Sequence, residues 1–185
     1  MMQILAQPVG PDDHSRGPAH APITLVEYGD YECPDCRLAY LVLADVLQEL
    51  GDAVRFVFRN YPQTKEHPQA ISAALAAESV GARGGEDAFW SMHDLLYENQ
   101  DALQDDDLVE YAAASGVDPI AVADDLSTGA TASRVQRDIR SGRRSGVRHT
   151  PTFFVNGRRF DGDWSDPLAL ADALQDGTRG HIHTH

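Results

Sequence analysis

Residues 23–36 of the chain read ITLVEYGDYECPDC. The run from Ile23 to Tyr28 is apolar and strand-like, and it leads into a Cys-x-x-Cys motif formed by Cys33 and Cys36. These are the only cysteines among 185 residues. A chain with its whole cysteine content in one such motif is most simply interpreted as a dithiol/disulfide redox protein.

The spacing of the motif suits that chemistry. Pro34 is a good first residue for a helix that continues to Leu50, and Cys33 would then be its N-cap. Unpaired backbone amides and the positive end of the helix dipole would stabilise the thiolate of Cys33. Cys36 lies one turn further on the same face, within reach of a disulfide. We therefore predict that Cys33 is the nucleophile and Cys36 the resolving thiol.

Half of a zinc site is the alternative interpretation of a single Cys-x-x-Cys motif. Zinc would need two further ligands, and with no other cysteine these would be histidines. The chain offers eight of them: His14, His20, His67, His93, His149, His181, His183 and His185.

A second informative segment, residues 146–160, reads GVRHTPTFFVNGRRF. It contains a Thr150-Pro151 bond, an apolar strand, and an Asn156-Gly157 pair before a second strand-like run. Asn-Gly between two such runs is a strong signal for a β-hairpin, because both central residues adopt positive φ.

Together the two segments resemble the thioredoxin fold, and within it the DsbA-like oxidoreductases. The chain is similar to the DsbA-like domain fused behind some bacterial sodium/proton antiporters, from about Asp12 to Leu174. The resemblance implies an α/β thioredoxin fold with a helical insertion domain. It also implies that Pro151 is cis and faces the dithiol, and that the backbone of Thr150 pairs with a bound substrate.

Glu27 occupies the position at which the resembling families place a buried acid that moves a proton to or from the resolving cysteine. A charged residue on a central strand is seldom buried without a partner, so a raised pKa would suit a general acid/base there. The alternative is that the alternation of side chains along this short strand turns Glu27 outward.

Two positions depart from the family pattern. DsbA has Cys-Pro-His-Cys, whereas this chain has Asp35 in place of the histidine and Glu32 before the motif. Two carboxylates oppose the helix dipole, so we expect a less acidic Cys33 and a reduction potential nearer thioredoxin (roughly −270 mV) than DsbA (roughly −120 mV). His149 stands where the family usually has glycine. It either supplies positive charge close to Cys33 or is a surface residue without a role.

The composition narrows the possible partners. The net charge is −14, with 29 acidic against 15 basic residues, so we expect no binding to nucleic acid or to anionic membranes. One arginine-rich stretch before the Thr-Pro bond departs from this pattern, and it is either a solvated helix face or a surface that steers an acidic partner or a glutathione carboxylate. Its members are Arg134, Arg137, Arg140, Arg143, Arg144 and Arg148.

We predict one thioredoxin-like domain in two parts, 21–62 and 146–178, interrupted by a helical insertion, 63–145. Residues 1–20 are predicted to form an N-terminal arm, and 179–185 a tail. No stretch is long and apolar enough to span a membrane. The first ten residues lack the features of a secretory signal, so a cytoplasmic location is expected.

The predicted function is thiol–disulfide oxidoreduction through a mixed disulfide, with protein thiols and disulfides or glutathione as partners. No cofactor or metal is needed, because the cysteine pair carries the electrons. The alternatives from other classes are a redox-sensing or binding module that does not turn over, and a zinc-binding protein. A third, within enzymes, is a related fold that uses glutathione, which usually lacks a working Cys-x-x-Cys.

Overall fold

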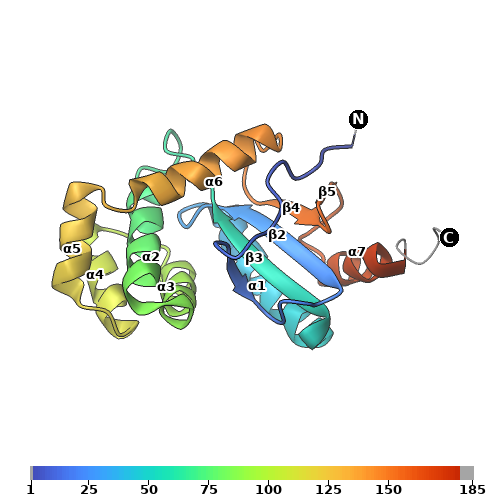
Figure 1. The fold of residues 1–185 in the computed structure, drawn as a ribbon, viewed down its shortest axis with the longest axis horizontal. Helices are drawn as coiled ribbons and strands as arrows, with labels where there is room; N and C mark the ends of the chain where they lie inside the picture. Colours follow the sequence, from blue (N-terminus) through green and yellow to red (C-terminus); the bar gives the residue numbers. More distant parts are fainter. Residues whose placement is uncertain (1, 180–185) are drawn as a thin grey trace.

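The computed structural model describes residues 2–179 as one five-stranded sheet surrounded by helices (Figure 1). The strands are β1 (His14–Arg16), β2 (Ile23–Gly29), β3 (Val54–Asn60), β4 (Thr152–Val155) and β5 (Arg158–Phe160). The helices are α1 (Pro34–Leu50), the 3-10 turn η1 (Gly51–Ala53), α2 (Ala70–Gly84), α3 (Glu86–Glu98), α4 (Asp105–Ala114), α5 (Pro119–Thr128), α6 (Ala132–Arg144) and α7 (Pro167–Arg179).

The strand order is β1-β3-β2-β4-β5. The two central strands, β2 and β3, are parallel and are joined by α1, whereas β4 and β5 form an antiparallel hairpin beside β2. Asn156 and Gly157 form the turn of that hairpin with φ of 47° and 80°, as the Asn-Gly pair predicts. The expectation of a thioredoxin fold with a helical insertion is confirmed.

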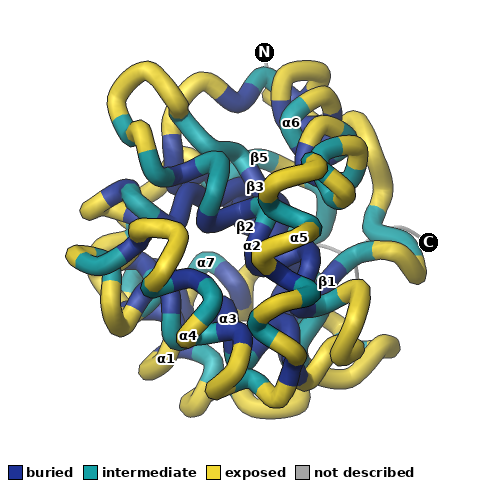
Figure 2. The backbone as a smooth tube through the Cα atoms, turned by 90° about the vertical axis from the view of Figure 1, so that its left-hand side faces the viewer, coloured by how far each residue is buried: buried dark blue, intermediate teal, exposed yellow. Residues whose placement is uncertain are grey.

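Both faces of the sheet are covered, which explains the apolar character of its central strands. On one face, Leu25 of β2 packs in a cluster that includes residues of α1, α3 and α7. On the other face, Val26, Val57 and Phe154 pack against Leu5 of the N-terminal arm and Val147. Figure 2 shows β2 and β3 buried along the middle of the molecule.

The helices α2 to α6 form a lobe inserted between β3 and β4, and α6 returns from the lobe to the sheet (Figure 1). The junction is polar and buried. The backbone amide of Asn60, at the end of β3, donates to Asp138 of α6 (3.0 Å), and its side chain donates to Glu78 of α2 (2.7 Å). These bonds fix the lobe against the strand that ends beside the candidate site.

The element boundaries differ from the sequence-based expectation in three places. Residues 14–16, expected to lie in an arm, form β1 and pair with the outer edge of β3. The sequence also predicts helices over about 67–82 and 128–144, whereas α2 begins at Ala70 and α6 at Ala132. Gly129 adopts a left-handed φ of 68° and ends α5, so the chain must turn again before α6 can start. Residues 180–185, most of the predicted tail, lie outside the described residues.

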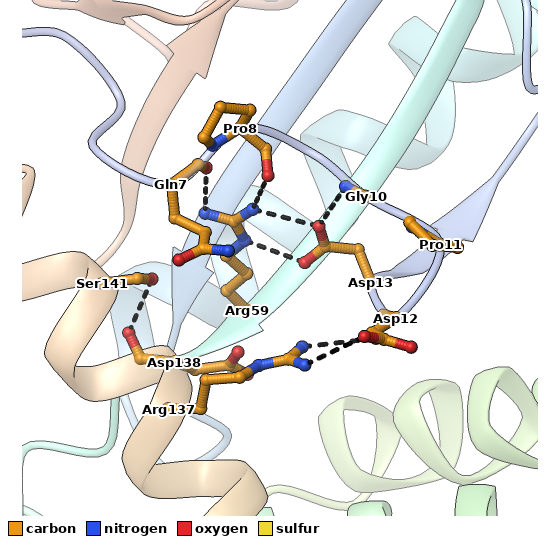
Figure 3. Close-up of a pocket in the computed structure, with 10 residues that line it drawn as sticks. All are labelled: Gln7, Pro8, Gly10, Pro11, Asp12, Asp13, Arg59, Arg137, Asp138 and Ser141. Carbon is orange, nitrogen blue, oxygen red and sulfur yellow. Dashed lines mark hydrogen bonds and ion pairs between the residues drawn. The ribbon is translucent and has the colours of Figure 1, made fainter.

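The N-terminal arm is held by a buried arginine of β3 (Figure 3). The guanidinium of Arg59 forms an ion pair with Asp13 and donates to the carbonyl oxygens of Gln7 and Pro8 and to the hydroxyl of Tyr28. Residues 7–13 are therefore part of the packed structure.

Candidate active site

The two cysteines lie at the start of α1, just beyond the end of β2. Cys33 is the N-cap residue, with φ −72° and ψ 122°, and Pro34 is at the first helical position, as the spacing predicts. Both cysteines are free thiols. Both residues are buried, but Cys33 is 5% exposed whereas Cys36 is fully buried, so Cys33 is the more accessible of the two.

The surroundings of Cys33 favour its thiolate. A hydrogen bond from the thiol of Cys36 lowers the pKa of Cys33 most, burial opposes this, and contacts with Thr150 and the amides of Cys36 and Asp35 lower it further, to about 6. The amide contributions are those of a helix N-terminus. Near neutral pH, Cys33 is therefore largely ionised.

Cys36 has the opposite environment. Burial, followed by its hydrogen bond to Cys33 and the charges of Glu27 and Cys33, raises the pKa of Cys36 well above the ordinary value for a thiol. The two thiols therefore have separate states at neutral pH, an attacking thiolate and a protonated partner.

Glu27 is buried on the central strand β2, so the alternative in which it turns outward is wrong. Its side chain lies on the same face of the sheet as Leu25, the face covered by α1, because alternate residues of a strand share a face. Burial, and next the charge of Cys33, raise the pKa of Glu27 to about 8. Its Oε1 atom has no hydrogen-bond partner within the described part of the chain. A buried carboxyl with an unused oxygen is able to accept or release a proton near neutral pH.

The loop before β4 lies against the dithiol. The Thr150–Pro151 peptide bond is cis, and the Sγ atom of Cys33 lies 3.6 Å from the carbonyl oxygen of Thr150. The hydroxyl of Thr150 donates to the side chain of Gln63 (2.8 Å), which holds the loop in place. The structure thus brings together the two segments that the sequence separates by more than 100 residues.

His149 directly precedes Thr150 in this loop. It is exposed and lines a pocket of about 270 Å³ with Pro151, Arg159 and Trp164, among others. Its carbonyl oxygen accepts a hydrogen bond from Thr152 (2.7 Å). The imidazole is not among the leading causes of the lowered pKa of Cys33.

The two carboxylates that were expected to oppose the helix dipole are Asp35, within the motif, and Glu32, just before it. Asp35 is exposed, and its backbone amide supports the thiolate of Cys33 while its side chain faces solvent. The carboxylate of Glu32 accepts a hydrogen bond from the amide of Gln69 (2.6 Å), just before α2. A hydrogen bond from another segment thus holds the Glu32 carboxylate in place.

Asp30 organises the site and was not predicted from the sequence. Its buried carboxylate accepts hydrogen bonds from the amides of Glu32 (2.8 Å) and Gln63 (2.9 Å) and contacts Nδ1 of His67 (2.8 Å). Burial lowers the pKa of His67, but Asp30 and then the charges of Cys33 and Glu32 outweigh it, so the net shift is upward. His67, considered above only as a zinc ligand, is therefore coupled to the thiolate of Cys33, whose charge favours the protonated imidazole.

Gln100, from the loop between α3 and α4, is a second unpredicted contributor. Its side-chain amide donates to the carbonyl oxygens of Tyr31 and Cys33, each at 2.9 Å. One side chain of the helical lobe therefore fixes the turn that carries the nucleophile.

Within residues 2–179, no group of three or more His, Cys, Asp or Glu side chains is arranged to hold a metal ion. In the same range, no helix is long and apolar enough to cross a membrane.

The parallel β2–α1–β3 unit, the dithiol at the start of α1 and the opposing cis-proline loop define a thioredoxin-fold redox protein of the DsbA-like class. A thioredoxin family model matches residues 10–175, and the chain belongs to that family.

Sequence relatives include the Na(+)/H(+) antiporter NhaA 3 of Salinispora tropica, 44% identical over 162 residues, and NhaA 1 of Mycobacterium sp. (strain KMS), 39% identical over 176 residues. The matches cover 87% and 94% of this chain but only 24% and 28% of those proteins. The chain thus spans about a quarter of the length of these curated relatives.

Among solved structures, BdbD from Bacillus subtilis in its oxidised form aligns with a TM-score of 0.84 and 26% identity, covering 96% of this chain and 99% of that one. DsbA2 of Pseudomonas aeruginosa aligns with a TM-score of 0.74 and 24% identity, covering 96% and 100%. The similarity to DsbA2, at 24% identity, shows only that the two proteins share a fold.

Proposed function

We propose that the protein is a thiol–disulfide oxidoreductase that works through the Cys33–Cys36 pair. The observation that carries this is the unequal pair of thiols at the start of α1. Cys33 has a pKa of about 6 and is the more accessible, whereas Cys36 is buried with a raised pKa. The oxidoreductase class of the family supports the same proposal.

In the reducing direction, the thiolate of Cys33 attacks one sulfur of a substrate disulfide. The substrate S–S bond breaks, one substrate thiolate leaves, and a mixed disulfide forms. Cys36 then loses its proton and attacks the sulfur of Cys33, which releases the second substrate thiolate. Two electrons pass to the substrate, and the Cys33–Cys36 disulfide remains. Oxidation of a substrate dithiol is the same sequence in reverse.

Glu27 takes the proton from Cys36 in the reducing direction and returns it in the oxidising direction. Its pKa of about 8 and the unpartnered Oε1 atom support this role. A carboxyl group with an ordinary pKa would be ionised throughout the neutral range and would be a weaker source of protons.

The Thr150–Pro151 loop is the proposed docking site for the substrate backbone, next to the sulfur of Cys33. The partners are proteins or peptides that carry thiols or disulfides. We assign no cofactor, since the cysteine pair itself stores the two electrons. A cytoplasmic location stays part of the proposal.

Two measurements test the proposal. Equilibration against glutathione, with mass spectrometry of alkylated thiols, gives the reduction potential. A value below about −240 mV fits a reductant, and one above about −180 mV an oxidant or isomerase. Reduction of a model protein disulfide should be catalysed and should cease in Cys33→Ser. If the pair titrates with glutathione but no disulfide exchange is catalysed, the protein is instead a redox-sensing module without turnover.

A further inference from the structure

A groove of about 550 Å³ opens beside the segment that leads into the cis-proline loop. It lies between the segment that follows β3 and the C-terminal part of α6. The groove has an apolar part formed by Tyr61, Pro62, Ile71 and Ile139, and a polar part formed by Gln63, Thr64, Lys65, Glu66, Gln136, Arg143 and Arg148.

The cations of this groove have no internal partners. Lys65, Arg143 and Arg148 are all exposed, and none of them forms an ion pair with another residue in the range 2–179. Glu66 is the single acidic residue in the lining. The lining thus has three cations and one carboxylate, so the groove is positively charged although the chain has a net charge of −14.

The arginines of the stretch differ in their contacts. Three of them contact other segments and tie α6 to its surroundings: Arg134 contacts Glu78 of α2, Arg137 contacts Asp12, and Arg144 donates to Gln7. Arg143 and Arg148 have no such structural role and line the groove. Of the two interpretations of the stretch given above, a solvated face or a surface for an acidic partner, the second fits these two positions.

Gln63 connects the groove to the reacting sulfur. Its side-chain oxygen accepts from the hydroxyl of Thr150 (2.8 Å), and its amide group donates to the carbonyl oxygen of Arg148 (3.4 Å). The carbonyl oxygen of the same Thr150 lies 3.6 Å from Sγ of Cys33. A peptide whose sulfur reacts with Cys33 could therefore extend directly into the groove.

We propose that this groove binds an acidic, extended segment of the substrate polypeptide, so that Lys65, Arg143 and Arg148 select substrates with carboxylates near the reactive cysteine. The apolar part would take the peptide's aliphatic or aromatic groups, and the cations its carboxylates. The inference rests on the proposed function, since it names the substrate class of the same site.

The test uses two synthetic peptides of equal length, each with one cysteine linked by a disulfide to a chromophoric aryl thiol. Three aspartates flank the cysteine on each side in one peptide, and lysines replace them in the other. Attack by reduced Cys33 on the peptide sulfur releases the coloured thiolate, so the second-order rate constant is read directly. We expect the acidic peptide to react about tenfold faster than the basic one at low salt, although the overall charge of the protein disfavours it.

A charge-matched pair of variants assigns the effect to the groove. Arg143→Glu with Arg148→Glu should slow the acidic peptide about tenfold and abolish the preference. Arg140→Glu with Arg158→Glu makes the same change in net charge at exposed positions that do not line the groove. This control should retain the preference. The proposal would be overturned if both double variants lost the preference for the acidic peptide equally, or if the parent protein showed no such preference.

Binding of a cysteine-free acidic peptide, followed by fluorescence anisotropy, separates this inference from the proposed function. Binding that is lost in the groove variant but kept in the control supports the groove even if no thiol exchange occurs. Rapid exchange with both peptides, without anisotropy change for the acidic one, supports the oxidoreductase and refutes the groove.

Discussion

The sulfur of Cys33 lies 3.6 Å from the carbonyl oxygen of Thr150, a residue 117 positions further along the chain. The contact joins the start of α1 to the loop before β4, and it places the nucleophile where a docked peptide backbone would pass. The chemistry of the site depends on keeping this juxtaposition while the charge on the sulfur changes.

Cys36→Ala should raise the pKa of Cys33. The hydrogen bond from the thiol of Cys36 is the largest cause of the lowered value of about 6. Its loss is expected to move the titration upward by about one pKa unit, since hydrogen bonds to charged groups contribute about 1.5–3 kcal/mol and one unit is about 1.4 kcal/mol. Ultraviolet absorbance of the thiolate against pH measures this, with Cys33→Ala as the blank. An unchanged midpoint would assign the stabilisation to the helix amides instead.

Glu27→Gln should slow the resolution of the mixed disulfide by about 100-fold, the usual range for a lost general acid/base. Attack by Cys33 on the first sulfur should change much less. Single-turnover kinetics, with the mixed disulfide trapped by acid and counted by mass spectrometry, separates the two steps. Equal slowing of both steps would contradict a specific role of Glu27 in deprotonating Cys36.

Glu27→Gln should also change how the free energy of unfolding depends on pH. The folded-state pKa of Glu27, about 8, lies above the ordinary value of 4.5, so its contribution to stability is present below pH 4.5 and is lost as the pH rises to 8. The contribution of Cys33 to stability has the opposite sign. Its pKa falls from 9.0 to about 6 on folding, so the thiolate stabilises the folded state increasingly as the pH rises through that interval. Compared with the parent protein, the free energy of unfolding of reduced Glu27→Gln should therefore rise more steeply, or fall less steeply, with pH between 4.5 and 8. Denaturant titrations of both proteins at several pH values measure this difference, and parallel pH profiles would contradict it.

His67→Ala should raise the pKa of Cys33 more than His149→Gly does. The interaction between two charges is mutual, and the charge of Cys33 contributes to the raised pKa of His67. His149 faces the pocket of Arg159 and Trp164. Titration of both variants against the parent decides between the two histidines. A larger shift in His149→Gly would restore the first interpretation of that residue, as a cation acting on Cys33.

Gln100→Ala should loosen the active-site turn. The side chain donates two hydrogen bonds, to the carbonyl oxygens of Tyr31 and Cys33. Losing both is expected to lower the free energy of unfolding by about 1–3 kcal/mol. Hydrogen exchange at the start of α1 should accelerate as well. Asn99→Ala is the matched control, because Asn99 bonds only locally, to the carbonyl oxygen of Leu95. Similar exchange rates in the two variants would show that the contact is dispensable.

Local signals in the sequence predicted the dithiol and the elements around it, and the resemblance to the DsbA-like family predicted the fold that joins them. The proline after Cys33 starts the helix, the apolar run before it forms the central strand, and the Asn-Gly pair forms the hairpin turn. The outer strand β1 has no such signal. Its three residues form a strand only because the edge of β3 offers free backbone groups.

The supporting residues of the site were missed for a similar reason. Asp30, His67 and Gln100 come from three separate segments, and nothing in their local sequence indicates that they converge on Cys33. Glu27 could be proposed because the resembling families place a buried acid at this position of the strand before the motif, whereas its burial depends on α1 covering that face of the sheet.

The arm held by Arg59 has a consequence for where this folding unit begins. The family match starts at residue 10, yet Leu5 packs against the sheet before it, and the carbonyl oxygens of Gln7 and Pro8 are bound by the guanidinium. A chain shortened to the matched region would uncover the apolar side chains beneath the arm and leave a buried cation short of acceptors. Aggregation would follow from such a truncation, even though every residue of the redox centre would still be present.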